Sequence, residues 1–119
     1  MEPDEDRLDR IFMALSDRTR RAVLRRLRDG PLTAGDLAAG VSLSQPTVSK
    51  HLKVLEAAGL ISRHRDGTRL YGVLAIDSLV RAAVYVSQFE EQVDARLDRL
   101  AAIVERPREE LHEEPGEAP

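Results

Sequence analysis

The apolar residues of this 119-residue chain recur at two different spacings. Apolar residues three or four positions apart predict amphipathic helices, because such residues fall on one helical face. Alternating apolar and polar residues predict strands, because neighbouring side chains then point to opposite faces. The helical spacing predicts five helices, at about residues 4–15, 17–28, 34–39, 45–58 and 76–104, and the alternation predicts two strands, at 60–65 and 69–74.

Cap and turn residues separate these predicted elements. A serine or threonine hydroxyl can accept a hydrogen bond from a first-turn amide, which makes these residues good N-caps. The expected N-caps of the second, third and fourth helices are Ser16, Thr33 and Ser44. Residues 29–31 and Gly59 end two of the helices, and residues 66–67 form a hairpin turn. Leu32 is expected to pair briefly with a strand.

The fourth predicted helix has one apolar face and one polar face. Its apolar stripe is Val48, Leu52 and Leu55. At about 100° per residue, Lys50 falls almost opposite this stripe. The other polar positions of the helix are Gln45, Thr47, Ser49 and Lys53. Cations neutralise phosphates, and hydroxyls and amides read base edges in a major groove, so the polar face fits duplex DNA. An ordinary amphipathic helix with solvated lysines is the alternative.

The third and fourth helices, joined through residues 40–43, form a helix-turn-helix arrangement. The hairpin that follows carries Arg63, Arg65 and Arg69 near its tip. A hairpin directly after a recognition helix is a wing, and its arginines could reach the DNA backbone or the minor groove. An ordinary surface hairpin is the alternative. The predicted fold class is therefore α+β: a mainly α winged helix-turn-helix with a β-hairpin wing, in the order α, α, α, α, β, β, α.

The last predicted helix, residues 76–104, carries an apolar residue at every seventh position. Heptad spacing suits packing on another helix, and a helix this long cannot bury its stripe against so small a domain. We expect it to pack with the first helix across the two-fold axis of a homodimer, with packing inside one chain as the alternative. The expected interface residues are Leu8, Ile11, Phe12, Leu79, Val86, Phe89, Val93, Leu97 and Leu100.

The domain boundary follows from these elements. Residues 1–106 are predicted to form one DNA-binding and dimerisation domain. Residues 107–119 are acidic and rich in glutamate, proline and glycine, a composition typical of a disordered tail.

The net charge of −3 hides a strong segregation of charge. Residues 18–72 hold eleven basic and four acidic side chains, whereas the segments on both sides are acidic. A basic middle between acidic ends is expected of a nucleic-acid surface carried on a dimerising frame. A stripe along the second helix contributes Arg18, Arg21, Arg25 and Arg28. We expect this stripe to be solvated or paired with the acidic ends, with phosphate contact as the alternative.

The composition excludes several classes of protein. The chain has no cysteine, and therefore no disulfide and no thiolate metal site. The acidic N-terminal segment is not a secretory signal, and no apolar run is long enough to cross a bilayer. We therefore expect a cytoplasmic protein without a membrane partner. No Ser-His-carboxylate spacing, glycine-rich phosphate loop or metal-ligand cluster is present, so neither an enzyme nor a cofactor is expected.

Five ordered motifs together resemble the ArsR/SmtB family of bacterial winged-helix repressors. They are LSDRTRRAVL (15–24), LA (37–38), LSQPTVSKHLKVL (43–55), AGLI (58–61) and RDGTRLY (65–71), within a match over roughly residues 8–104. The resemblance implies a homodimer that binds double-stranded operator DNA and is released by an effector. It also places Ser44, Gln45, Thr47, Ser49 and His51 in the DNA-reading part of the fourth helix. His51 lies at the border of the buried stripe, where a packing role and a phosphate contact compete evenly.

The residues depart from the metal sites of this family. One family site uses a cysteine pair where this chain has residues 33–36. A second uses carboxylates and histidines of the last helix, where Asp77 is followed by Leu79, Glu90 and Val93. The chain therefore resembles the cysteine-free members of the family. For this chain we expect no bound metal, and an inducer, if there is one, would be a small molecule. The alternatives are a metal-responsive repressor with an atypical site and a winged-helix interaction module that does not bind DNA.

Overall fold

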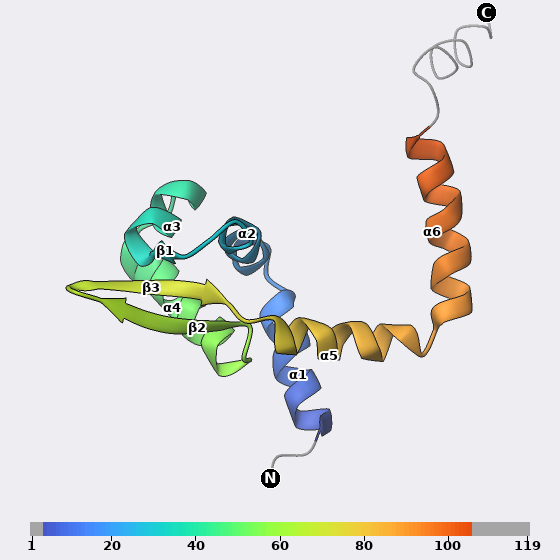
Figure 1. Ribbon diagram of the computed structural model, residues 1–119, viewed down its shortest axis with the longest axis horizontal. Coiled ribbons are helices and arrows are strands. Elements are labelled where there is room, and N and C mark those ends of the chain that lie inside the picture. The colour runs from blue at the N-terminus through green and yellow to red at the C-terminus, as the bar shows by residue number, and fades with distance from the viewer. Residues whose placement is uncertain (1–3, 106–119) are drawn as a thin grey trace, which may run out of the picture. The chain divides into compact units, whose positions relative to one another are not determined.

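The computed structural model describes residues 4–105, which form six helices and three strands (Figure 1). The predicted tail, residues 107–119, lies outside the described residues. In chain order the elements are α1 (Asp4–Leu15), α2 (Arg18–Leu27), β1 (Leu32–Thr33), α3 (Ala34–Val41), α4 (Gln45–Ala57), β2 (Ile61–Asp66), β3 (Arg69–Leu74), α5 (Ile76–Ser87) and α6 (Glu90–Val104). The chain divides into two compact units, Met1–Tyr85 and Val86–Pro119.

The core of the first unit lies among α2, α3 and α4, with β2 and β3 packed against these helices. Helical spacing in the sequence assigned most of these side chains to inner faces, so the predicted pattern and the observed core agree. The largest fully buried side chains of α2, α3, α4 and the residues that follow include Val23, Leu27, Leu37, Val48, Leu52, Leu55 and Leu60.

The predicted hairpin is present as the antiparallel pair β2–β3, which turns at Gly67. The φ of Gly67 is +66°, a left-handed conformation that favours glycine. β1 pairs with the other edge of β3, where Leu32 lies opposite Gly72. The brief strand pairing expected of Leu32 is therefore confirmed, and it ties the hairpin to the segment that enters α3.

The start of α2 differs from the prediction. Its N-cap is Asp17, whose carboxylate accepts a hydrogen bond from the Arg20 amide at 3.0 Å. Ser16, the expected cap, instead donates to the carbonyl oxygen of Met13 at 2.6 Å. That carbonyl belongs to the last turn of α1, where carbonyl groups have no intrahelical partner. The N-caps expected for α3 and α4 are confirmed.

The prediction of one helix over residues 76–104 is wrong, because α5 ends at Ser87 and α6 begins at Glu90. Phe89 precedes α6 with φ −111° and ψ 32°, outside the helical region. Neither proline nor glycine lies in this break, and the heptad pattern continues through it. The sequence therefore carries no local signal for a break here. Every side chain of residues 83–92 is exposed. Serine and phenylalanine, which lie at the break, have only modest helix propensities.

The residues expected at a dimer interface differ in burial. Ile11 is only 1% exposed, so its expected contact with a partner is wrong, because its own chain buries it. Leu79 is half-buried against the core of the first unit, and Leu8 and Val93 are also half-buried. The exposed members of the set are Phe12, Val86, Phe89, Leu97 and Leu100.

Candidate nucleic-acid interface

Helix α4 presents the polar face that the sequence predicts. Ser44 starts it: the serine Oγ accepts from the Thr47 amide at 3.3 Å and donates to Thr47 Oγ1 at 2.9 Å. Pro46 lies in the first turn, where its missing N–H costs no hydrogen bond. The buried stripe orients the helix so that its polar side chains lie outside. Ser49 is half-buried, and the exposed polar positions are Gln45, Thr47, Lys50 and Lys53.

A groove of about 600 Å³ lies between α4, the hairpin and the start of α3. Gln45 and Ser49 line it from α4, and Arg63 and Arg69 line it from the hairpin. Gly35 forms part of the α3 wall, and a Cβ there would lie 3.5 Å from Gln45 Oε1. The Nε atom of Arg63 is buried without a hydrogen-bond partner in the part of the chain that the structure describes. The groove therefore combines two arginines with the amide and hydroxyl of the recognition helix.

Asp36 supplies the negative charge of this groove. Its carboxylate accepts from the Thr33 amide at 3.2 Å, and its own amide donates to Thr33 Oγ1 at 3.1 Å, which together form a capping box. Hydrogen bonds from Thr33 hold the pKa of Asp36 below its ordinary value of 3.8, and the charge of Arg69 lowers it further. Asp36 is thus a fixed carboxylate beside Arg69, and the groove as a whole stays positive.

The remaining predicted DNA-binding residues lie outside this groove. Lys50 and Lys53 are on the exposed side of α4, and Arg65 is exposed near the turn of the hairpin. Arg63 is farther from the turn than predicted, because it pairs with Gly72 in the middle of the hairpin. The three hairpin arginines therefore occupy two environments: Arg63 and Arg69 face the groove, and Arg65 faces solvent.

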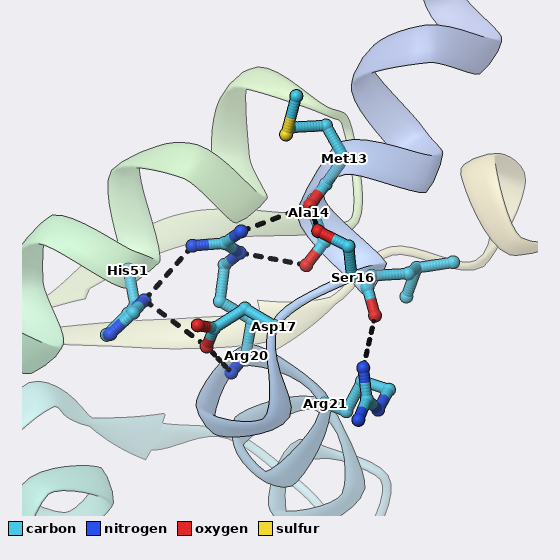
Figure 2. Close-up of polar contacts among 8 residues, drawn as sticks. Met13, Ala14, Ser16, Asp17, Arg20, Arg21 and His51 are labelled. Carbon is cyan, nitrogen blue, oxygen red and sulfur yellow. Dashed lines mark hydrogen bonds and ion pairs between the residues drawn. The ribbon is translucent and has the colours of Figure 1, made fainter.

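His51 points toward α2 (Figure 2). Its Nδ1 lies 3.2 Å from Arg20 Nη1 and 3.8 Å from Asp17 Oδ2, and its side chain is 20% exposed. Of the two roles left open by the sequence, these contacts favour packing between helices. Phosphate contact by His51 is correspondingly disfavoured.

Arg20 has contacts that the sequence analysis above does not predict. Its guanidinium donates from Nε to the carbonyl oxygen of Ala14 at 2.8 Å and from Nη2 to that of Met13 at 3.1 Å. The signal was present, because Arg20 lies three and seven residues before Val23 and Leu27 and so shares their inner face. A cation on the buried face of a helix needs partners.

The predicted arginine stripe of α2 is exposed. Arg18, Arg25 and Arg28 have no hydrogen bond from their side chains and no ion pair within residues 4–105. Arg21 donates from Nη1 to the carbonyl oxygen of Leu15 at 2.8 Å. Within residues 4–105 the stripe is therefore exposed to solvent and forms no ion pair with the acidic ends.

Comparison with known proteins identifies the class. A family described as "Helix-turn-helix domain" matches residues 15–64. An HTH-type transcriptional regulator of Mycobacterium tuberculosis, Rv2034, is 51% identical over 61 residues, which are 51% of this chain and 57% of the length of that relative. The transcriptional repressor SdpR of Bacillus subtilis is 44% identical over 64 residues, 54% of this chain and 71% of that repressor.

Solved structures extend the match over most of the chain. The crystal structure of an ArsR family transcriptional regulator has 32% sequence identity and a TM-score of 0.69, covering 79% of this chain and 97% of that one. The chain belongs to the ArsR family of transcriptional regulators. A homodimeric winged helix-turn-helix DNA-binding domain of Mycobacterium bovis, solved by NMR, has 28% identity and a TM-score of 0.60, covering 73% of this chain and 82% of that fragment. The predicted winged helix-turn-helix fold is thereby confirmed.

Two further observations describe this ArsR-family chain. Within residues 4–105, no group of three histidine, cysteine, aspartate or glutamate side chains could hold a metal ion. None of the helices in the same residues combines the length and the hydropathy needed to cross a membrane.

Proposed function

We propose that the chain is a homodimeric repressor that binds a pseudo-palindromic operator through α4 and the β2–β3 wing. The observation that carries this proposal is the placement of the polar face of α4 beside the groove that holds Arg63 and Arg69. A helix in the major groove reads base edges with short polar side chains, while cations around it neutralise phosphates. This surface offers both kinds of group on adjoining elements.

The side chains divide into two roles. Gln45, Thr47 and Ser49 are the base-reading candidates, because amides and hydroxyls discriminate donors from acceptors. Lys50, Lys53 and Arg65 are the phosphate-contact candidates, because they are exposed and their side chains form no hydrogen bond or ion pair within residues 4–105. Arg63 lines the groove, and its buried Nε has no hydrogen-bond partner within residues 4–105.

The homodimer supplies the second half of the operator site. Exposed apolar side chains on α1, α5 and α6, including Phe12, Val80 and Leu97, support an interface. The homodimeric M. bovis relative supports the same assembly. Two recognition helices related by two-fold symmetry reach major grooves about 34–36 Å apart, or a multiple of that distance. The operator is therefore expected to be a pseudo-palindrome.

The inducer that we propose is a small molecule or another non-metal effector. Cysteine, the ligand that soft metals prefer, is absent from the sequence.

The test selects bound fragments from the source genome, including the region upstream of the chain's own gene, and measures their affinities at two salt concentrations. Lys50→Ala is expected to weaken the selected duplex and a random duplex together, and to lower the salt slope by about one. Gln45→Ala is expected to relax preference at one base pair, at a cost of roughly 1–3 kcal/mol. Arg99→Ala on α6 is the matched control.

Equal loss of affinity for both duplexes in both variants would contradict this division of roles. Absence of any duplex preference in the wild-type protein would overturn the proposed function in favour of a protein-interaction module.

A further inference from the structure

One guanidinium group joins three parts of the first unit (Figure 2). The Arg20 side chain holds the last carbonyl groups of α1, at Met13 and Ala14, and its Nη1 reaches Nδ1 of His51 on α4. The backbone amide of the same arginine is capped by Asp17. A planar guanidinium donates in fixed directions, so contacts to several acceptors restrain the elements that carry them. The end of α1 and the recognition helix are therefore restrained by one side chain.

We propose that Arg20 and His51 are positioning residues for DNA recognition, holding α4 in the rotation at which Gln45 and Ser49 meet base edges. In this proposal His51 does not bind a DNA phosphate. The proposal rests on the DNA-binding function proposed above and adds two residues to it, neither of which lines the groove.

The hydrogen-bond chemistry of the pair supports this role. Arginine nitrogens only donate, so Nδ1 of His51 accepts and the neutral ring carries its proton on Nε2. The charged groups that face the ring are Arg20 and Asp17 of α2, and Asp17 Oδ2 at 3.8 Å lies beyond hydrogen-bond distance. Protonation of Nδ1 would break the contact with Arg20. The contact therefore belongs to the neutral histidine.

The position of His51 on α4 allows the pair to affect the rotation of the polar face of this helix. His51 lies two residues beyond Ser49 on α4, and the apolar stripe of that helix packs on the core. Apolar burial is non-directional, whereas a hydrogen bond to a planar donor is directional. Loss of the Arg20 contact is therefore expected to change the helix rotation more than the burial of the helix.

The test compares two amide substitutions at one position. Asparagine places its amide oxygen where the imidazole has Nδ1, whereas glutamine places its amide group near the position of Nε2. His51→Asn is expected to keep affinity for the selected duplex within about threefold, and His51→Gln to weaken it about tenfold. Both variants are expected to keep the wild-type affinity for a random duplex, the salt slope and the midpoint of thermal unfolding. Arg20→Lys keeps the charge but cannot span three acceptors, so its loss of affinity for the selected duplex should match that of His51→Gln.

Three results would overturn the proposal. If His51→Gln keeps the affinity for the selected duplex and His51→Asn loses it, His51 is a phosphate ligand. The same conclusion follows if both variants lower the salt slope by about one. Equal losses for both duplexes, together with a lower unfolding midpoint, would make the pair merely structural. If the wild-type protein shows no duplex preference, the proposed DNA-binding function is wrong, and the positioning role is wrong with it. This measurement is made before any variant is compared.

Discussion

The hydroxyl group of Ser78 in α5 donates a hydrogen bond of 2.7 Å to the carbonyl oxygen of Ala58, the C-cap of α4. Ser78 is 3% exposed, so this bond is formed away from water. The carbonyl groups at a helix end have no partner inside the helix, and the serine supplies one. The start of α5 is thereby hydrogen-bonded to the end of the recognition helix.

Removal of this bond should destabilise the fold. Ser78→Ala leaves the Ala58 carbonyl buried without its partner, and we expect the free energy of unfolding to fall by roughly 1–2 kcal/mol. Urea unfolding followed by circular dichroism measures the loss. Thr68→Ala on the exposed hairpin is the control and should change stability by less than about 0.5 kcal/mol. A Ser78→Ala variant as stable as this control would contradict the expected role of the bond.

Gly59 faces the same serine and gives a second prediction. Its φ is +71°, and a Cβ added there would lie 2.7 Å from Ser78 Oγ. Gly59→Ala therefore combines a left-handed backbone, which costs about 1–2 kcal/mol, with a steric clash. In the Ser78→Ala background the clash is absent and the backbone cost remains. A double-mutant cycle should show that Gly59→Ala costs at least about 0.5 kcal/mol less in that background; strict additivity would show that the two sites do not interact.

The sequence predicts the first unit well, because local signals and burial agree there. The N-cap hydroxyl of Ser44, the apolar spacing of Val48, Leu52 and Leu55, and the turn at Gly67 all match the structure. The same signals predict the polar face of α4. They do not predict which polar residues meet across elements, since that depends on how the helices pack.

Arg20 and the break near Phe89 show the two limits of this prediction. The contacts of Arg20 join residues as far apart as 31 positions, and no local pattern encodes that distance. The break before α6 carries no proline or glycine, so a repeating apolar pattern predicts one continuous helix. Helix propensity and packing decide the outcome there, and the apolar spacing reports neither of them.

Asp17 gives a prediction about acid stability. The hydrogen bond from the Arg20 amide lowers the pKa of Asp17 below its ordinary value of 3.8, and the charge of Arg20 lowers it further. A carboxyl group with a lowered pKa stabilises the fold fully above about pH 3.8, and this contribution is lost as the pH falls through the lowered pKa. Asp17→Ala also removes the N-cap and should cost roughly 0.5–2 kcal/mol at neutral pH.

The pH dependence separates charge from capping. The stability difference between wild type and Asp17→Ala should be constant near neutral pH and should shrink only below about pH 3.8. Asp17→Asn keeps a capping oxygen without the charge, so it should cost less than the alanine variant at neutral pH. Urea unfolding at a series of pH values measures both differences. A difference that already changes near pH 6 would show that a histidine contributes as well as Asp17.

Helix α6 provides the test of the dimer. Leu97 and Leu100 are three residues apart and both exposed, and no side chain of α6 is buried within the described chain. If a partner covers them, each leucine contributes about 1.5–3 kcal/mol of burial, and two-fold symmetry uses each of them twice. Replacement of both by glutamine should therefore raise the dimer dissociation constant by at least about a hundredfold. Sedimentation equilibrium measures this constant directly.

The matched control replaces Arg96 and Arg99 of the same helix by glutamine, which changes surface charge without removing apolar area. Because folding and association are linked, the wild-type unfolding midpoint should rise with protein concentration, and that dependence should weaken in the leucine variant alone. The leucine variant should also lose preference for a two-half-site operator over a single half-site, since a monomer offers one recognition helix. An unchanged dissociation constant in the leucine variant would place the dimer interface elsewhere, on the exposed apolar side chains of α1 and α5.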